Sequence, residues 1–315
     1  VFRHWMGNVQ DWNISRQIVW GIPIPAKICD ACDKGFVDTA DEKTICESCD
    51  GLLRQETDTF DTWFSSGQWP LTTTGFPDSS DFKKFYPTSV METAADILFF
   101  WVARMVMFGL YLTDEVPFKD VYLHGLVRDA QGKKMSKSKG NVISPLEVSN
   151  EYGTDALRMG LIVKNAPGVD MKKKKKKVGA YKKFANKIWN ATRFVLEKTS
   201  DYEEIGGEFT EEDSSAFDVW MAVKKDITDD LENYRLHLAS QKIYDYFWKT
   251  FCDELIETRK MRILENKDKE SAQKLLLTLL REQLIVLHPF MPFITEEIWK
   301  YIKKGDDNLL IVTKW

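Results

Sequence analysis

Two cysteine pairs form a metal-binding pattern in this sequence of 315 residues. Cys29 and Cys32 make one CxxC knuckle, and Cys46 and Cys49 make a second after 13 intervening residues. Two such knuckles can present four thiolates to one tetrahedral zinc ion, which would be structural because no ligand position stays open. The alternative is two redox-active pairs or unpaired thiols. In the absence of a recognisable secretory signal, we expect metal rather than disulfides.

A lysine-rich loop is the second pattern that could carry chemistry. Between Gly132 and Gly140 it holds four lysines and two serines, directly after a β-like run at residues 121–124. Ammonium groups in such a loop can neutralise phosphate charge that develops in a transition state, which suits a triphosphate substrate. Composition alone favours a solvated surface or a nucleic-acid contact over catalysis. The order of the residues is therefore needed to distinguish these alternatives.

The elements that must position these groups indicate an α/β layout followed by a helical bundle. Residues 92–112 are apolar with helical spacing, and residues 144–163 also have a helical pattern. A strand, a phosphate-binding loop and flanking helices favour an α/β fold. After Pro167 the periodicity is helical almost throughout, which is typical of a bundle. We expect the domain boundary near residues 165–175.

The composition is that of a globular protein, with 43% hydrophobic, 29% charged and 13% aromatic residues. The longest apolar stretch, residues 97–112, is interrupted by Arg104, so we expect no membrane span. The formal net charge of −4 hides an uneven distribution. Residues 171–198 contain 11 bases and one acid, whereas residues 201–213 contain seven acids and no base. Such a basic patch suits a polyanionic partner.

The lysine loop spells a known signature. Lys134 to Ser138 read KMSKS, which is identical to the signature of class I aminoacyl-tRNA synthetases, and His124 to Asp129 resemble the strand that precedes it in that family. Further segments resemble the valyl branch of the family: residues 11–21, 61–67, 96–105 and 287–299. They are spread along the chain, so the resemblance extends over nearly its whole length.

The resemblance implies the second half of a split Rossmann catalytic fold with a zinc-ribbon insertion, followed by an all-α anticodon-binding bundle. Residues 1–28 would follow the editing insertion, and residues 29–51 would form the zinc ribbon. Residues 52–170 would be the second Rossmann half with the KMSKS loop. Residues 171–315 would be a truncated anticodon-binding domain.

The resemblance also implies a valine–tRNA ligase. Such an enzyme activates valine with ATP and Mg2+ to valyl-adenylate, then transfers valine to tRNA(Val); structural Zn2+ completes the expected cofactors. A cytoplasmic location, a monomeric full-length enzyme and no membrane partner are implied as well. Lys134 and Lys137 would contact the ATP phosphates, with Lys137 the stronger candidate for transition-state stabilisation. The implied ATP-binding residues are His124, Gly125, Val127, Lys134, Met135, Ser136, Lys137 and Ser138.

The amino-acid pocket is implied in the same way. Asp96 would take the substrate ammonium, while Trp63, Ile97 and Trp101 would wall the side chain. An ammonium needs a carboxylate and an isopropyl group needs a rigid apolar slot. Positions 97 and 101 are four apart, so they share a helix face. The alternative makes Ile97 and Trp101 ordinary core residues and Asp96 a helix N-cap.

The sequence also departs from the family pattern. No His-x-Gly-His motif is present, and its histidines would contact the ATP phosphates. We therefore expect a partial enzyme, inactive alone, that lacks the N-terminal catalytic half, the editing domain and the extreme C-terminus. The six lysines Lys172–Lys177 have three alternative interpretations: a tRNA contact, a solvated surface run or a sequencing artefact. Ala94 and Ala95 stand at positions where the family often has glycine. Competing hypotheses are a relative for isoleucine, leucine or methionine, and a non-enzymatic RNA-binding module.

Overall fold

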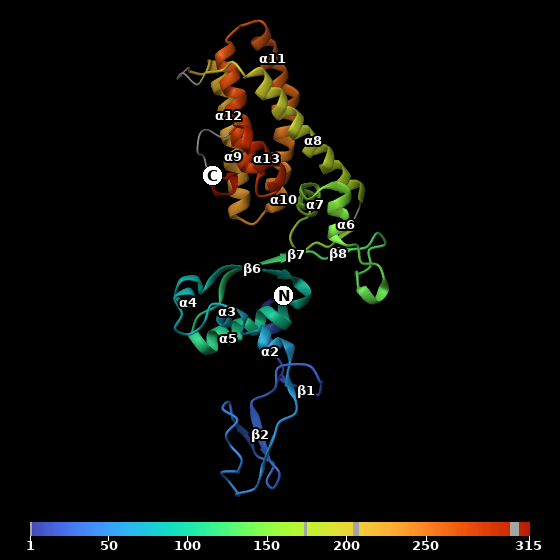
Figure 1. The fold of residues 1–315 in the computed structure, drawn as a ribbon, viewed down its shortest axis with the longest axis vertical. Coiled ribbons are helices and arrows are strands. Elements are labelled where there is room, and N and C mark those ends of the chain that lie inside the picture. Colours follow the sequence, from blue (N-terminus) through green and yellow to red (C-terminus); the bar gives the residue numbers. More distant parts are fainter. Residues whose placement is uncertain (1, 173–174, 204–207, 303–308) are drawn as a thin grey trace. The chain divides into compact units, whose positions relative to one another are not determined.

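The computed structural model describes residues 2–172, 175–203, 208–302 and 309–315. The chain divides into two compact units, residues 1–123 and residues 124–315, and each is described by itself (Figure 1). The domain limits expected from the sequence follow a different division, and they stay predictions.

A small three-stranded sheet carries the cysteine pairs in the first unit. Strands β2 (Ala26–Cys29), β3 (Gly35–Val37) and β4 (Leu53–Gln55) pair antiparallel in the order β3-β2-β4. Strands this short bury little apolar surface, and polar contacts fix the adjoining loop instead. Lys27 Nζ lies 3.2 Å from Asp38 Oδ2, and Asp38 accepts backbone N–H bonds from Glu42 and Lys43.

The remainder of the first unit consists of short helices around the pair β6 (Thr88–Ala94) and β7 (Phe118–His124). The other elements are α1 (Phe2–Gly7), β1 (Ser15–Arg16), β5 (Thr59–Phe60), α2 (Thr62–Ser66), α3 (Trp69–Thr72), α4 (Ser80–Phe85), the 3-10 turn η1 (Ala95–Ile97), the π-turn η2 (Leu98–Val102) and α5 (Ala103–Thr113). The core of this unit contains Met91, Leu98, Val102, Met105 and Phe118.

The helix expected over residues 92–112 begins later than predicted. Residues up to Ala94 belong to strand β6, where the β-branched residues of the segment favour extended backbone. The stretch Ala95–Thr113 is long and apolar enough to cross a membrane by length and composition. The same test is passed by core helices, and Leu98, Val102 and Met105 of this stretch pack into the core of the unit.

The second unit begins with a short parallel pair and the lysine loop. Strand β8 (Val127–Arg128) pairs with β9 (Met171–Lys172). Between these strands lie the 3-10 turn η3 (Lys137–Lys139), α6 (Pro145–Tyr152) and α7 (Thr154–Ile162).

Long helices make up the rest of the second unit, as the sequence predicts (Figure 1). They are α8 (Lys175–Lys198), α9 (Glu211–Glu232), α10 (Leu236–Asp245), the π-helical η4 (Tyr246–Ile256), α11 (Glu257–Leu264), α12 (Lys269–Leu287) and α13 (Pro292–Ile302), followed by the 3-10 turn η5 (Leu310–Val312). Helix α12 packs against α8, α9, α11 and α13. Six of its seven leucines are therefore fully buried: Leu275, Leu276, Leu279, Leu280, Leu284 and Leu287.

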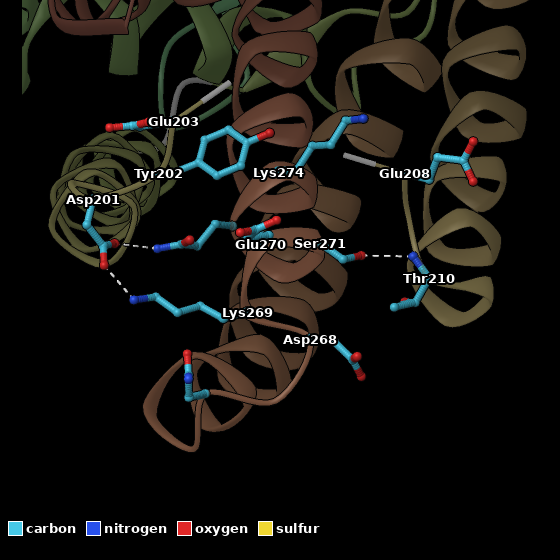
Figure 2. A pocket seen from close by; sticks show the side chains of 12 residues that line it. Asp201, Tyr202, Glu203, Glu208, Thr210, Asp268, Lys269, Glu270, Ser271 and Lys274 are labelled. Atoms are coloured by element: carbon cyan, nitrogen blue, oxygen red, sulfur yellow. Dashed lines mark hydrogen bonds and ion pairs between the residues drawn. The ribbon is translucent and has the colours of Figure 1, made fainter. Parts of the chain in front are cut away.

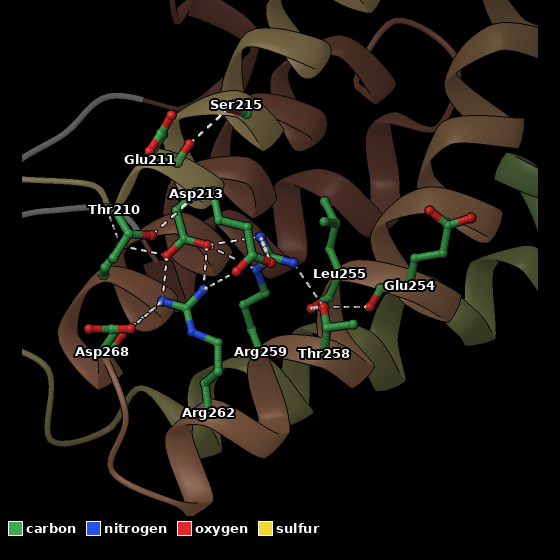
Figure 3. Close-up of polar contacts among 12 residues, drawn as sticks. Thr210, Glu211, Asp213, Ser215, Glu254, Leu255, Thr258, Arg259, Arg262 and Asp268 are labelled. Atoms are coloured by element: carbon green, nitrogen blue, oxygen red, sulfur yellow. Dashed lines mark hydrogen bonds and ion pairs between the residues drawn. The ribbon is translucent and has the colours of Figure 1, made fainter.

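A buried ion network ties three of these helices together (Figure 3). Asp213 near the start of α9 is fully buried and accepts bonds from Arg259 Nε at 3.0 Å, Arg262 Nη1 at 2.9 Å and Ser271 Oγ at 2.5 Å. Burial raises the pKa of Asp213, but hydrogen bonds from Arg262 and Ser271 outweigh it and hold the pKa below its usual value. The carboxylate therefore stays ionised and links α9 to α11 and α12.

Candidate functional site

The four cysteines of the two knuckles come together as the spacing predicts. Cys29 Sγ lies 3.5 Å from Cys49 Sγ, and Cys32 Sγ lies 3.7 Å from Cys46 Sγ. All four sulfur atoms lie within 4.8 Å of one another, and no disulfide joins them. This is a donor set of the size that one metal ion needs.

Both knuckles are built in the same way. The N–H of Ala31 points at Cys29 Sγ and the N–H of Ser48 points at Cys46 Sγ, each at 3.4 Å. These backbone N–H groups stabilise the thiolate form of each cysteine. A methyl group on Gly51 would lie 3.0 Å from Cys29 Sγ, so the close approach of the second knuckle requires glycine here.

The electrostatics of the cluster also fit a bound cation. Burial raises the pKa of Cys29, but hydrogen bonds from Cys32 and Ala31 outweigh it and lower the pKa. A bond from Gly51 lowers the pKa of Cys49, yet its neighbours Cys29 and Cys32 raise it overall. An ionised Cys29 thus disfavours a second thiolate at Cys49. A dication removes this conflict, because metal binding deprotonates coordinating thiols.

The KMSKS loop lies in the second unit, between β8 and α6. Lys134 forms an antiparallel bridge with Arg128, and the hydroxyl groups of Ser136 and Ser138 are hydrogen-bonded at 3.1 Å. The backbone of Lys137 opens the turn η3, whereas its side chain lies outside the described residues. Among the other expected ATP-binding residues, Lys134 and Ser138 are exposed. The remaining five are half-buried: His124, Gly125, Val127, Met135 and Ser136.

The approach to the loop is shaped by a glycine. A Cβ on Gly125 would lie 1.8 Å from the carbonyl oxygen of Val169, so no side chain fits between the two backbones. Asp170 holds the same junction, because its Oδ1 accepts the N–H of Leu126 at 2.8 Å. His124 Nδ1 lies 3.1 Å from the carbonyl oxygen of Gly125. The backbone at His124 and Gly125, two of the predicted ATP-binding residues, is therefore fixed by the segment before β9.

Two residues that sequence reasoning assigned no role hold the loop itself. Asp129 is 7% exposed, and its carboxylate accepts backbone N–H bonds from Gln131 and Lys133. Asn141 donates to the other carboxylate oxygen at 2.8 Å and accepts the N–H of Ser136 at 2.9 Å. Asp129 stands inside a segment that resembles the family and Asn141 lies three residues after the KMSKS signature, but nothing in residue type distinguishes such bonds from ordinary turn contacts.

The residues expected to bind the amino acid lie in the first unit. Trp101 on η2 donates its Nε1–H to the carbonyl oxygen of Ser66 at 2.9 Å, at the end of α2. Trp63 on α2 stacks on Phe100, with ring centroids 5.9 Å apart. Helix α2 and the π-turn therefore hold both tryptophans on one small framework.

Asp96 and Ile97 sit in the turn η1 beside this framework. Asp96 is exposed and Ile97 is half-buried. The N-cap alternative for Asp96 is wrong, because the residue at the cap position of η1 is Ala94 and Asp96 lies inside the turn. A role for Asp96 in ammonium binding stays a prediction.

A buried carboxylate that we did not single out orients Trp63. Asp61 is 6% exposed and is the N-cap of α2, accepting the N–H of Trp63. Its Oδ2 also accepts bonds from Trp12 Nε1 at 2.8 Å and Arg16 Nη2 at 2.7 Å. The segment of residues 12–16 is thereby joined to the helix that carries Trp63.

Two cavities among the described residues are lined by none of the predicted site residues. In the first unit, a cavity of about 600 Å³ is lined by residues such as Trp5, Phe99 and Met107. The second unit has a polar cavity of about 560 Å³. Lys269 Nζ donates to the Asp201 carboxylate in its lining (Figure 2). Its lining is acidic on balance, with Asp201, Glu203, Glu208, Asp268 and Glu270 against Lys269 and Lys274. A phosphate backbone is not what such a lining attracts.

The lysine run Lys172–Lys177 lies only partly within the described residues. Residues 173–174 are outside them, as are the side chains of Lys172 and Lys175. Lys176 is exposed, whereas Lys177 is half-buried and donates to the carbonyl oxygen of Val163 at 2.6 Å. Burial lowers the pKa of Lys177. This last lysine is therefore a packing residue, and a tRNA contact by the run stays a prediction.

Comparison with protein families gives two matches. The family described as tRNA synthetases class I (I, L, M and V) matches residues 1–174. The family described as anticodon-binding domain of tRNA ligase matches residues 213–315.

Curated relatives match along the whole chain. A valine--tRNA ligase from Petrotoga mobilis is 47% identical over 100% of this chain and 37% of its own length. A valine--tRNA ligase from Geobacter sulfurreducens is 48% identical over 94% of this chain and 34% of its own length. The chain thus spans about a third of the length of the curated relatives it matches.

Solved structures share the fold. The ternary complex of Agrobacterium radiobacter K84 agnB2 LeuRS with tRNA and LeuAMS aligns with a TM-score of 0.74 at 23% identity, covering 98% of this chain and 43% of that one. Mycobacterium tuberculosis methionyl-tRNA synthetase bound by methionyl-adenylate aligns with a TM-score of 0.75 at 18% identity, covering 96% and 57%. The expected fold class is confirmed: part of a Rossmann-like catalytic fold, a four-cysteine ribbon and a helical anticodon-binding part.

Proposed function

The chain belongs to the class I tRNA synthetases for isoleucine, leucine, methionine and valine, and from this premise we propose that it carries part of the machinery of a valine--tRNA ligase. The proposed reaction activates valine with ATP to valyl-adenylate and then transfers valine to tRNA(Val). One observation carries the proposal. A KMSKS loop stands in a chain that is 47% identical over its whole length to a valine--tRNA ligase.

The proposed catalytic groups are the loop lysines. Lys134 and Lys137 bind the phosphates of ATP with Mg2+, and Lys137 stabilises the charge that develops as pyrophosphate leaves. In support, Lys134 is exposed on a backbone that a β-bridge fixes. A cation carried on a preorganised backbone needs less reorganisation when charge develops, which increases its contribution.

The proposed valine site uses the framework of α2 and the π-turn. Asp96 binds the ammonium group of valine, and Trp63, Ile97 and Trp101 surround its isopropyl group. In support, the bond from Trp101 to Ser66 holds the indole against α2. Rigid aromatic walls are what a small apolar substrate requires, because one methylene in such a pocket is worth about 1–3 kcal/mol of discrimination.

The proposed metal is Zn2+, held by Cys29, Cys32, Cys46 and Cys49. Four sulfur ligands leave no position for a substrate, so the ion would stabilise the ribbon and take no part in the reaction. The proposed partner of the second unit is tRNA(Val), which is consistent with the anticodon-binding match at residues 213–315. We also propose a cytoplasmic, monomeric full-length enzyme with no membrane partner.

Valine-dependent ATP–pyrophosphate exchange tests this function on the full-length gene product that contains the chain. Lys134→Ala and Lys137→Ala should each lower the exchange rate by about 100-fold or more, since each removes a cation from the developing charge. Lys139→Ala is the matched control, because it removes the same charge from the same loop outside the KMSKS residues; exchange should stay within about threefold of the unmodified protein. Equal losses in all three variants would contradict the assigned roles.

A further inference from the structure

The lysine loop is closed by hydrogen bonds between residues at its two ends. Asp129 Oδ1 accepts the N–H groups of Gln131 at 3.0 Å and Lys133 at 2.7 Å. The backbone of Asp129 also pairs with Lys133, its N–H donating to the carbonyl oxygen at 3.0 Å. The first turn of the loop is therefore wrapped around one buried carboxylate, which is 7% exposed.

Asn141 connects that carboxylate to the middle of the loop. Its Nδ2 donates to Asp129 Oδ2 at 2.8 Å and to the carbonyl oxygen of Lys134 at 3.3 Å. Its Oδ1 accepts the N–H of Ser136 at 2.9 Å. One amide thus holds the backbone on both sides of Met135.

The hydrogen bonds described for this pair end on backbone atoms of the loop or on the partner side chain. They therefore fix the path of the loop backbone. The bond from Asn141, followed by that from Lys133, holds the pKa of Asp129 below its usual value, so the carboxylate is ionised at neutral pH. Hydrogen bonds to an ionised acceptor are roughly twice as strong as neutral ones. Such a device is needed because Gly132 and Gly140, both at positive φ, leave the loop backbone free to rearrange.

We propose that Asp129 and Asn141 form a positioning pair that holds the KMSKS backbone, so that Lys134 and Lys137 meet the phosphates of a nucleoside triphosphate. This inference rests on the proposed function, which it deepens by naming the residues that preorganise the loop. Neither residue touches the substrate. Their contribution is the alignment of cations before the reaction, and misplacement by about 1 Å can cost about 100-fold in rate.

Three variants test the pair. In Asp129→Asn, the new NH2 group faces another donor in either orientation, the Nδ2 of Asn141 or the N–H of Lys133. Asn141→Asp sets two carboxylates against each other. The exchanged double variant, Asp129→Asn with Asn141→Asp, restores a donor opposite an acceptor and keeps the bonds to Gln131, Lys133 and Ser136; it replaces the 3.3 Å bond to the Lys134 carbonyl oxygen by a contact between two acceptors.

Two measurements report on these variants: the rate of tryptic cleavage within residues 133–139, and valine-dependent ATP–pyrophosphate exchange with kcat and KM for ATP separated. Each single variant should be cleaved about tenfold faster and should lose about tenfold or more in kcat/KM for ATP, since a bond to a charged group is worth a factor of this size. The double variant should recover to within about threefold of the unmodified protein. Asn141→Ala provides a second truncation should either charge-altering single variant fail to fold.

Asp155→Asn is the matched control. Asp155 is also 7% exposed and also accepts two backbone N–H bonds, from Phe293 and Ile294. This variant should lower the melting temperature but leave loop cleavage and KM for ATP unchanged. The positioning role would be refuted if both single variants were cleaved and exchanged pyrophosphate at the rates of the unmodified protein. It would also be refuted if the double variant recovered neither rate relative to the single variants. An unmodified protein without valine-dependent exchange would refute the proposed function, while the cleavage rates would still decide whether the pair holds the loop.

Discussion

Removal of the Asp213 carboxylate should destabilise the helical unit strongly. Asp213 is fully buried, and Arg259 beside it is only 4% exposed (Figure 3). Removing one partner of a buried ion pair costs about 3–5 kcal/mol, because the other charge is left without compensation. Glu212 lies 3.1 Å from Arg259 Nη2 and offsets part of this loss. We therefore expect the lower end of the range, about 3 kcal/mol, for Asp213→Asn at pH 7.

Urea unfolding followed by far-UV circular dichroism measures this difference. Asp230→Asn is the control, since Asp230 is 3% exposed but its partners Arg235 and Lys242 reach solvent. Solvent screening there limits the loss to about 1 kcal/mol. If the unfolding free energy of Asp213→Asn lay within about 0.5 kcal/mol of that of the unmodified protein, the reasoning would be refuted. Burial of the ion pair would then not determine how much stability the substitution removes.

The Asp213 carboxylate should also make the unfolding free energy fall at acid pH. Its folded pKa lies below the ordinary value of 3.8, so it stabilises the fold fully above that pH. This contribution is lost as the pH falls from about 3.8 through the lower folded pKa. Asp213→Asn should therefore show a flatter decline of unfolding free energy in that window, and parallel declines would contradict the ionised network.

The remaining predictions concern the ribbon and the approach to the loop. Metal analysis of the purified protein should find one zinc ion per chain, lost on Cys46→Ser together with the order of the ribbon; a metal-free protein with a folded ribbon would contradict the cluster. Gly125→Ala should disrupt the loop region and lower the melting temperature by several degrees, since its Cβ would lie 1.8 Å from the Val169 oxygen. Gly35→Ala, with nothing within 4 Å of its Cβ, is the control and should leave the melting temperature nearly unchanged.

What could be predicted from the sequence is chemistry that residue type and spacing fix locally. The cysteine cluster follows from two knuckles, because each knuckle is a short turn that fixes its own geometry. The helical unit follows from apolar periodicity that one long buried helix, α12, satisfies. The spelling of the lysine loop identifies the family without any structural information.

What could not be predicted depends on where backbone groups lie in space. Asp61, Asp129 and Asn141 act through backbone N–H groups or buried partners, and no pattern in the sequence shows which Asp or Asn does so. The start of the helix at Ala95 was missed because apolar residues of β6 continue the helical spacing. Lys177 looks like one more solvated lysine, yet its ammonium bonds the carbonyl oxygen of Val163.

The central claim is that this chain belongs to the catalytic machinery of a valine-specific ligase. ATP–pyrophosphate exchange by the full-length gene product, measured with valine, isoleucine, leucine and methionine in parallel, tests it most directly. We predict that kcat/KM for valine exceeds that for isoleucine by at least about tenfold, since an extra methylene would have to enter the proposed pocket beside Trp63 and Trp101. Exchange that isoleucine supports better than valine would contradict the account.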